Sequence, residues 1–273
     1  MEKSLSARAN QGFPLSDTSA LVLLLLGDDF YESAAAQDYL RGLDLSAGAP
    51  LCKTLRDIYP HYPQVIHNRK FVVRNMAQHH VRPQIVIAGA GLDAMGLELS
   101  AMLKEAEIFE LDHVNMEVKQ QMIGRMGDTK KPHCVSADLS HPAQMMAALR
   151  NAGWSADAPS LLILEGITYY LTPAQLTNLV TTLSPERIIA DFLKPSAELS
   201  DEAARIADAA FGAIIKACDL DGITRYSAES LAQTISREVI DKWSMARIES
   251  ERPNAVQNFG SAENGWIELA VFK

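Results

Sequence analysis

The stretch QIVIAGAGLDAMG, Gln84–Gly96, runs an apolar segment into two glycines spaced one residue apart, Gly89 and Gly91. This pattern predicts a buried strand, a tight turn and a helix that begins at about Ala94. Glycines at such a turn let the backbone approach a ligand where a side chain would block it. Ala94 completes the spacing G-x-G-x-x-A, so the turn by itself fits a dinucleotide site, another nucleotide site, or a structural turn without a ligand.

Short apolar runs alternate with helical stretches after residue 83. Strands are predicted at 84–91, 107–113, 133–139, 160–171, 187–193, 239–249 and 266–273, and helices at 94–104, 115–126, 141–151 and 173–183. Thr172 and Pro173 stand in the cap and first-turn positions of the fourth helix. This alternation predicts a doubly wound α/β fold, in which a mostly parallel sheet is covered on both faces.

The end of the chain departs from this alternation. Between Arg237 and Lys273 two strand runs are separated by a polar stretch without a helical pattern, which predicts a closing antiparallel pair. A mostly parallel sheet of seven strands with an antiparallel last strand is the layout of the Rossmann-like class I methyltransferases. A plain dinucleotide-binding sheet has six parallel strands instead.

Helical regions precede and interrupt this sheet. Residues 1–83 contain several helical stretches and are predicted to form an N-terminal helical layer packed on a ligand-binding core, 84–273. The core carries a helical insertion at about 197–225, and such insertions often shape a substrate pocket. Its apolar stretch 206–218 fits either a pocket roof or a homodimer contact. With no internal repeat or linker evident, we expect a single compact domain.

Composition excludes several classes of function. The 273 residues are 48% hydrophobic, and 34 acidic against 25 basic side chains give a net charge of -9, which disfavours nucleic acid and anionic membranes as partners. The cysteines, Cys52, Cys134 and Cys218, lack metal-site spacing, so we expect reduced thiols and no metal. The apolar run 20–27 is too short to span a bilayer and lacks the features of a signal peptide, so a cytoplasmic protein is expected.

Acidic residues at the ends of predicted strands narrow the choice of ligand. Asp112 ends the second strand about twenty residues after the glycines, where a carboxylate can accept both hydroxyls of an adenosine ribose. Asp138 ends the third strand, where a methyltransferase would bind the adenine amino group; Ser140 is the better candidate for capping the helix that follows. Asp93, inside the turn, would repel a pyrophosphate but could accept a hydrogen bond from an ammonium group.

An NAD(P)-dependent oxidoreductase remains an alternative use of the same turn. A short-chain dehydrogenase would need a Tyr-x-x-x-Lys pair, and the segment after Tyr169 and Tyr170 has Pro173 and Ala174 where the lysine would fall. The sequence offers no other catalytic set for hydride transfer.

Several segments together resemble the leucine carboxyl methyltransferase family, which includes tetracenomycin-type polyketide O-methyltransferases. The segments that carry the resemblance, in family order and spacing, are NRKFVVRN (68–75), QIVIAGAGLDAMGLEL (84–99), IFELDH (108–113), SADL (136–139) and LLILEGITYYLTPAQL (161–176). They lie within residues 60–185. The combination is specific to this family, although each segment alone is not.

The resemblance implies S-adenosylmethionine as the cofactor and gives roles to individual residues. Arg74 would pair with its carboxylate, Gly89 would lie against its methionine part, Glu165 would face its ammonium and Asp112 its ribose. Asp138 and Leu139 would contact the adenine. The remaining residues predicted to bind the cofactor are neighbours of these positions or belong to the turn: Ala90, Gly91, Asp93, His113 and Gly166.

The sequence departs from the family pattern at two places. Ala94 and Met95 stand where members often carry the motif GLDTR, and Val22 stands where the members that methylate a protein phosphatase carry a lysine. These differences favour a small-molecule acceptor, such as a polyketide or another secondary metabolite, over a protein C-terminus. They also leave open a non-catalytic protein that binds the cofactor or a partner.

The acceptor oxygen could belong to a carboxylate or to a hydroxyl. A carboxylate is already ionised and needs no base, whereas a hydroxyl needs one, most often histidine. Tyr170 is predicted to border the reaction pocket. Arg225 and Tyr226, which follow the insertion helix, are predicted to orient the acceptor, although Ser227 equally fits the cap of an ordinary helix there.

Overall fold

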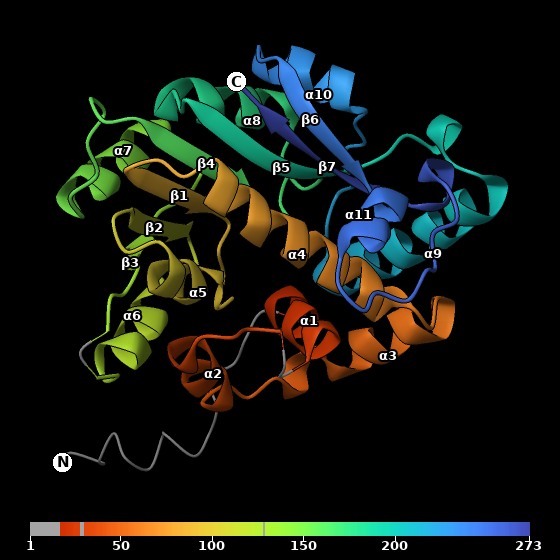
Figure 1. The fold of residues 1–273 in the computed structure, drawn as a ribbon, viewed down its shortest axis with the longest axis horizontal. Helices are drawn as coiled ribbons and strands as arrows, with labels where there is room; N and C mark the ends of the chain where they lie inside the picture. Colours follow the sequence, from red (N-terminus) through yellow and green to blue (C-terminus); the bar gives the residue numbers. More distant parts are fainter. Residues whose placement is uncertain (1–16, 28–29, 128) are drawn as a thin grey trace.

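The computed structural model describes residues 17–27, 30–127 and 129–273 (Figure 1). A seven-stranded sheet runs through this part of the chain in the order β3-β2-β1-β4-β5-β7-β6. Its strands are β1 (Gln84–Ala88), β2 (Glu107–Asp112), β3 (His133–Ser136), β4 (Ser160–Leu164), β5 (Arg187–Leu193), β6 (Val239–Ser244) and β7 (Ile267–Phe272). Strands β1 to β5 pair in parallel, and β7 pairs antiparallel with both β5 and β6. The predicted sheet with an antiparallel last strand is confirmed.

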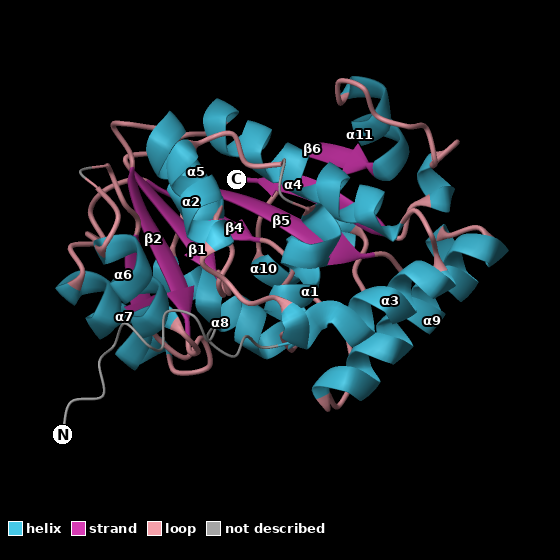
Figure 2. Cartoon of the chain, turned by 90° about the horizontal axis from the view of Figure 1, so that it is seen from below, coloured by secondary structure: helices cyan, strands magenta, loops and turns pink. Residues whose placement is uncertain are grey.

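The sheet is buried on both faces because successive strand residues point to opposite sides. In β1, Ile85 and Ile87 pack into one core cluster with α4, α5 and α6, whereas Val86 and Ala88 pack into another with α7, α8 and α10. Figure 2 shows helices on both sides of the strands. The helices of these layers are α4 (Tyr62–His79), α5 (Met95–Met102), α6 (Met116–Gly124), α7 (Pro142–Asn151), α8 (Pro173–Leu183) and α10 (Ala228–Ile235). The arrangement is the predicted doubly wound one.

Three N-terminal helices and the insertion helix lie beyond the sheet. They are α1 (Asp17–Leu26), α2 (Ala34–Arg41), α3 (Ala49–Ile58) and α9 (Asp201–Cys218). Helices α1, α3 and α9 pack together, and α2 packs on α5, so the apolar side of the insertion is covered within the chain. The sequence patterns did not separate α3, and residues 1–16 of the predicted helical layer lie outside the described residues.

Two strand predictions extend too far. Strand β4 ends at Leu164 rather than at residue 171, because Gly166 adopts a positive φ of 70° and its N–H donates to Asp191 at 2.6 Å. Strand β6 ends at Ser244, whose side chain caps α11 (Met245–Glu251) by accepting from the Arg247 N–H. The last two strands are therefore joined through a helix and not by a helix-free stretch.

Short elements and caps complete the chain. The 3-10 turns are η2 (Ser46–Gly48), η3 (Ser196–Glu198) and η4 (Ala262–Asn264). Thr172 caps α8 in a reciprocal pair with Gln175, as its sequence position predicted. Ser227 caps α10. The segment around Tyr226 is therefore an ordinary helix start, which was one of the two interpretations that the sequence allowed.

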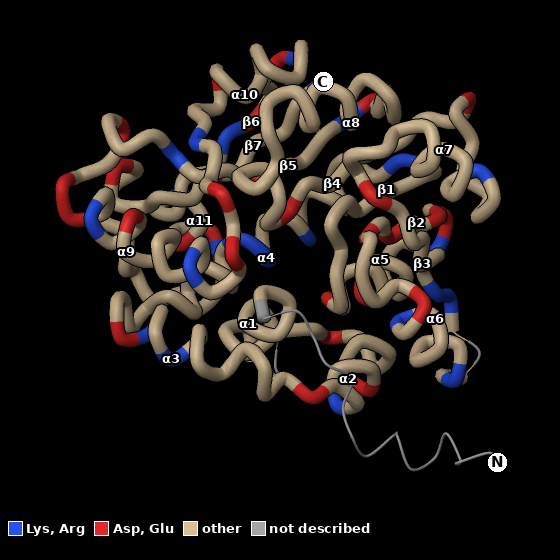
Figure 3. Tube along the Cα trace, turned by 180° about the vertical axis from the view of Figure 1, so that it is seen from behind, with Lys and Arg blue, Asp and Glu red and all other residues tan. Residues whose placement is uncertain are grey.

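The apolar helix α1 and the distribution of surface charge bear on membrane and polyanion binding. Among the described residues, no helix is long and apolar enough to cross a membrane. The apolar run 20–27 lies in and just after α1, where Leu21, Leu23 and Leu25 are buried. In Figure 3 the Lys and Arg positions are interspersed with Asp and Glu positions rather than gathered on one element.

Candidate functional site

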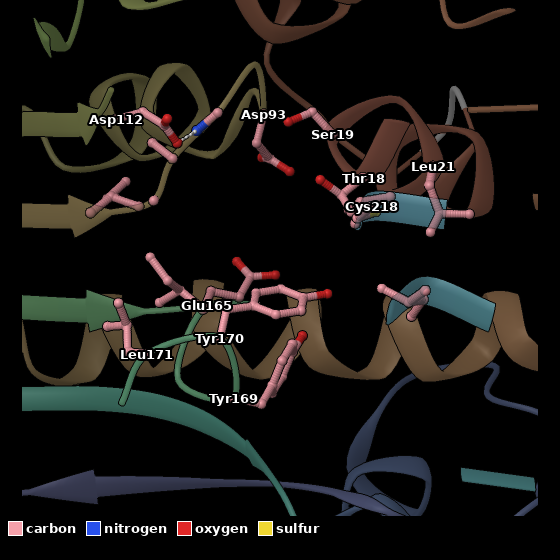
Figure 4. Close-up of a pocket in the computed structure, with 18 of the residues that line it drawn as sticks. Thr18, Ser19, Leu21, Asp93, Asp112, Glu165, Tyr169, Tyr170, Leu171 and Cys218 are labelled. Carbon is pink, nitrogen blue, oxygen red and sulfur yellow. Dashed lines mark hydrogen bonds between the residues drawn. The ribbon is translucent and has the colours of Figure 1, made fainter. Parts of the chain in front are cut away.

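A cavity of about 640 Å³ lies where the carboxyl ends of β1, β2 and β4 meet the helical layer. This volume is in the range of small-molecule sites, which are commonly about 300 to 1,000 Å³. Figure 4 shows the strands ending on one side of the cavity, with α1 and part of α9 on the other and α4 along its length. Its location at the carboxyl edge of a doubly wound sheet is the usual place for a ligand.

The glycine turn forms the wall of the cavity after β1. Gly89 and Gly91 have positive φ values of 69° and 51°. A Cβ on Gly89 would lie 2.4 Å from the end of the Ile167 side chain, and one on Gly91 would lie 2.6 Å from the Ser19 hydroxyl. Asp112 accepts from the Gly91 N–H at 2.9 Å, so its carboxylate is fixed beside the turn (Figure 4).

A buried ion pair, Lys119 with Glu110, contacts the backbone of the turn. Lys119, fully buried in α6, donates to the Glu110 carboxylate at 2.7 Å and to the backbone carbonyl of Asp93 at 2.5 Å. Glu110 also accepts from the Gly96 N–H at 3.2 Å. Burial raises the pKa of Glu110, although the ammonium of Lys119 opposes that shift. These contacts identify Lys119 as a residue that holds the backbone of the turn in place.

Charged side chains of opposite sign meet in the middle of the cavity. The Lys70 ammonium lies 2.6 Å from Asp93 and 2.9 Å from Glu165. Asp93 also accepts from the Tyr31 hydroxyl. Burial is the largest single influence and would raise the pKa of Asp93, but Lys70, the Tyr31 hydroxyl and Lys119 together lower it by more, so the net shift is downward. The carboxylates of Asp93 and Glu165 overcome the effect of burial on Lys70 and raise its pKa, so the Lys70 ammonium and the Asp93 carboxylate are both charged at neutral pH.

A second buried pair lies behind this cluster. Arg69 donates from Nε to Glu165 at 3.0 Å, and its Nη1 is 3.6 Å from Asp191. Asp191 is fully buried on β5 and accepts from the Gly166 N–H. Burial raises the pKa of Asp191 to about 6, although Arg69 pulls it down. The sequence patterns gave no role to Arg69, Lys70 or Asp191.

The raised pKa of Asp191 predicts a pH dependence of stability. The pKa of Asp191 is about 6 in the folded protein and near its ordinary value of 3.8 in the unfolded chain. The folded state therefore binds the proton more tightly, and protonation of Asp191 stabilises it. That contribution is complete below pH 4 and is lost as the pH rises through 6. Relative to an Asp191→Asn variant, the wild-type free energy of unfolding should fall by on the order of 2 to 3 kcal/mol between pH 4 and 7. Urea unfolding at both pH values measures it; a constant difference would contradict the assignment.

The structure brings most of the predicted site residues to one cavity. Those that line it are Gly89, Ala90, Gly91, Asp93, Asp112, His113, Asp138, Leu139, Glu165, Gly166 and Tyr170. Asp138 lies at its outer rim and accepts from the hydroxyl and the N–H of Ser140 at 2.7 and 2.8 Å. These bonds lower the pKa of Asp138 to about 2. The N-cap of α7 is His141, not Ser140 as expected.

Three predicted residues lie elsewhere. Arg74 pairs with Glu32 at 3.0 Å and with Glu98 at 3.4 Å, away from the cavity wall. Arg225 donates to Asp208 at 2.5 Å and to the backbone carbonyl of Lys194. Tyr226 is buried in the core cluster under α10. The cavity wall therefore offers two cations of α4, Arg69 and Lys70, of which Lys70 lies one helical turn before Arg74. It offers neither Arg225 nor Tyr226 to an acceptor.

The family follows from comparison with known proteins. Residues 35–184, more than half of the chain, match the model of the family named leucine carboxyl methyltransferase. The chain belongs to this family. The match contains α4, the glycine turn, Asp112, Asp138 and Glu165, which are the parts that surround the charged middle of the cavity. The resemblance predicted from the sequence is thus confirmed.

Curated relatives match part of the chain. A Streptomyces coelicolor protein, provisionally named an S-adenosyl-L-methionine-dependent methyltransferase, is 30% identical over 114 residues, which are 41% of this chain and 37% of the relative. A Mycolicibacterium paratuberculosis protein with the same provisional description is 32% identical over 133 residues, 47% of this chain and 41% of the relative. The chain thus aligns with less than half of the length of each of these relatives.

Solved structures match over most of the chain. A DUF574 family protein from Streptomyces avermitilis superimposes with a TM-score of 0.62 at 16% identity, over 90% of this chain and 98% of that one. A Thermobifida fusca protein, described provisionally as a methyltransferase, gives a TM-score of 0.65 at 15% identity, over 90% of this chain and 96% of that one. At these identities the match establishes the fold, which is that of the class I methyltransferases.

Proposed function

We propose that this protein is an S-adenosylmethionine-dependent O-methyltransferase that acts on a small molecule at a carboxylate or hydroxyl oxygen. The observation that carries the proposal is the pair of carboxylates, Asp93 and Glu165, that meet at Lys70 beside the glycine turn. S-adenosylmethionine carries an ammonium, a carboxylate and a sulfonium, and no phosphate. A dinucleotide would place two phosphates beside these acids, where like charges repel.

The residues that line the cavity fit this cofactor. Asp112, fixed beside the turn, would accept the ribose hydroxyls, and Asp138 with Leu139 would contact the adenine at the rim. Asp93 and Glu165 would accept the ammonium of the amino-acid tail. Lys70 is the wall cation that would pair with the carboxylate of the tail, a role that the sequence resemblance gave to Arg74.

Bound S-adenosylmethionine supplies an electrophilic methyl group and a neutral thioether leaving group. The contribution of the chain is alignment and the removal of water from the reacting atoms. Gly89 and Gly91 allow the backbone to approach the tail closely. Apolar side chains of α1 and α9, such as Leu25 and Phe211, line the far part of the cavity and would exclude water there.

Calorimetric titration separates the proposed function from its alternatives. We expect S-adenosylhomocysteine and S-adenosylmethionine to bind with micromolar or tighter affinity and NADP to give no heat. Binding of NADP alone would favour an oxidoreductase and overturn the proposal. If the cofactor binds but no methyl transfer occurs across a broad panel of carboxylates and phenols, a non-catalytic binding protein is the better description.

Gly89 offers a prediction with a matched control. Gly89→Ala and Gly27→Ala both place a Cβ at positive φ, 69° and 74°, and each should lower stability by about 1 to 2 kcal/mol. Only the Gly89 substitution also meets a neighbour, because no atom of the described residues lies within 4 Å of a Cβ on Gly27. S-adenosylhomocysteine affinity should fall at least tenfold in Gly89→Ala and stay unchanged in Gly27→Ala. Equal affinities in the two variants would remove the turn from the cofactor site.

A further inference from the structure

The part of the cavity farthest from Asp112 has a distinct composition. Its walls come from α1, α4 and α9, and we call it the acceptor chamber. The side chains that define the chamber are Leu21, Val22, Leu25, Ile66, Phe211 and Ile214. Figure 4 places Leu21 at the opposite end of the cavity from Asp112. Apart from the hydroxyls of Thr18 and Tyr62, which line the cavity on the same helices, the chamber presents hydrocarbon to whatever lies beyond the amino-acid tail of the cofactor.

The cations near the chamber are already paired. Lys70 lies between Asp93 and Glu165, and Arg69 bonds Glu165 with Asp191 behind it. His113 lines the Asp112 end, 3.4 Å from that carboxylate. Among the described residues that line the cavity, no further arginine, lysine or histidine occurs. A carboxylate acceptor would lose its water in the chamber without gaining a cation of its own, and burying an unpaired carboxylate is costly.

The Tyr170 hydroxyl lies where the charged middle of the cavity meets the chamber. In Figure 4 the ring of Tyr170 extends past the Glu165 carboxylate toward the side formed by Thr18 and Cys218. Burial raises the pKa of Tyr170 well above its ordinary value. The phenol therefore keeps its proton at physiological pH and can donate a hydrogen bond, but it cannot act as a base.

We infer that the acceptor is an apolar aromatic molecule methylated at a phenolic or enolic hydroxyl, with Tyr170 donating to the acceptor oxygen. The inference rests on the proposed function and selects one of its two acceptor oxygens. A phenol enters the chamber uncharged, so only a hydroxyl has to be desolvated. No histidine of the described residues lines the chamber, so a water molecule at the charged middle of the cavity would serve as the base and take the proton of the hydroxyl. An oxygen lone pair forms the bond to the methyl carbon, and the pair of the broken carbon–sulfur bond stays on sulfur, which becomes a neutral thioether.

A matched pair of probes tests this inference. With saturating S-adenosylhomocysteine present, calorimetry should show 1-naphthol binding at least tenfold more tightly than 1-naphthoate, which has the same ring system. If S-adenosylhomocysteine binds but the naphthoate binds equally or more tightly, or neither probe binds, the inference is overturned and the proposed function stands. If S-adenosylhomocysteine itself does not bind, the proposed function fails first.

Variants of Ile214 extend the test to the chamber wall. Ile214→Lys adds a cation to α9, whereas Ile214→Met keeps the site uncharged and similar in size. The ratio of naphthol to naphthoate affinity should fall at least tenfold in the lysine variant and change by less than threefold in the methionine variant. The affinity for S-adenosylhomocysteine, expected to be unchanged in both, reports that each variant is folded. An unchanged ratio in a folded Ile214→Lys protein would contradict the placement of the acceptor.

Discussion

Replacing Asp112 by alanine should weaken the binding of S-adenosylhomocysteine at least about 100-fold. The carboxylate is expected to accept two ribose hydroxyls, and hydrogen bonds to a charged group contribute about 1.5 to 3 kcal/mol each. Two such bonds amount to about 3 kcal/mol, and each 1.4 kcal/mol changes the affinity by about tenfold. The substitution also takes from the Gly91 N–H the acceptor that lies 2.9 Å away. Isothermal titration of both proteins measures the change.

A neighbouring acid provides the control for Asp112. Glu117 is exposed in the first turn of α6 and does not line the cavity. Glu117→Ala changes the net charge by the same amount, so a general electrostatic effect would appear in both variants. We expect unchanged affinity in Glu117→Ala. A loss of less than threefold in Asp112→Ala would remove the ribose assignment.

Replacing Lys70 by methionine is expected to affect both stability and binding. Its ammonium lies 2.6 Å from Asp93 and 2.9 Å from Glu165, and it is buried. Removing one partner of a buried ion pair typically costs about 3 to 5 kcal/mol, because the remaining charge is left unpaired. The affinity for S-adenosylhomocysteine should fall at least tenfold, since the tail carboxylate would also lose its partner. Urea unfolding and calorimetry measure the two effects.

A ligand without the amino-acid tail separates these two roles of Lys70. The affinity for 5'-methylthioadenosine should change by less than threefold in Lys70→Met, because that ligand has neither an ammonium nor a carboxylate. Arg74→Met, in which the lost cation pairs with Glu32 and Glu98 instead, should leave the affinity for both ligands unchanged. If Arg74→Met weakens S-adenosylhomocysteine binding and Lys70→Met does not, the sequence-based role of Arg74 is the correct one.

The fold was predictable from the sequence wherever a strong local pattern coincided with burial. Strand β5 and helix α8 have the predicted bounds, because a mostly apolar run and a Thr-Pro start determine them locally. Beyond Glu165 and Gly166 the segment is again rich in β-forming residues, so its pattern could not show where β4 ends. That end depends on Asp191, which accepts from Gly166 across the sheet. A contact between residues so far apart in sequence leaves no local signal.

The cavity was predictable at the strand ends and less so on the helices. Asp112 and Glu165 follow parallel strands, whose carboxyl ends must meet at one edge, so the topology alone brings them together. On α4 the motif NRKFVVR offers three cations, and the sequence does not show which of them faces the sheet. The packing of α4 directs Arg69 and Lys70 to Glu165 and leaves Arg74 to Glu98. No sequence pattern pointed to Lys119, because its ammonium donates to the backbone carbonyls of Gly91 and Asp93, and a backbone carbonyl has no residue type to recognise.

A crystal structure of the complex with S-adenosylhomocysteine tests the central claim most directly. The account predicts the ribose hydroxyls at Asp112, the ammonium between Asp93 and Glu165, and the tail carboxylate at Lys70. The acceptor chamber between α1, α4 and α9 should stay open next to the sulfur. A ligand bound outside this cavity, or one whose tail carboxylate pairs with Arg74, would contradict the account.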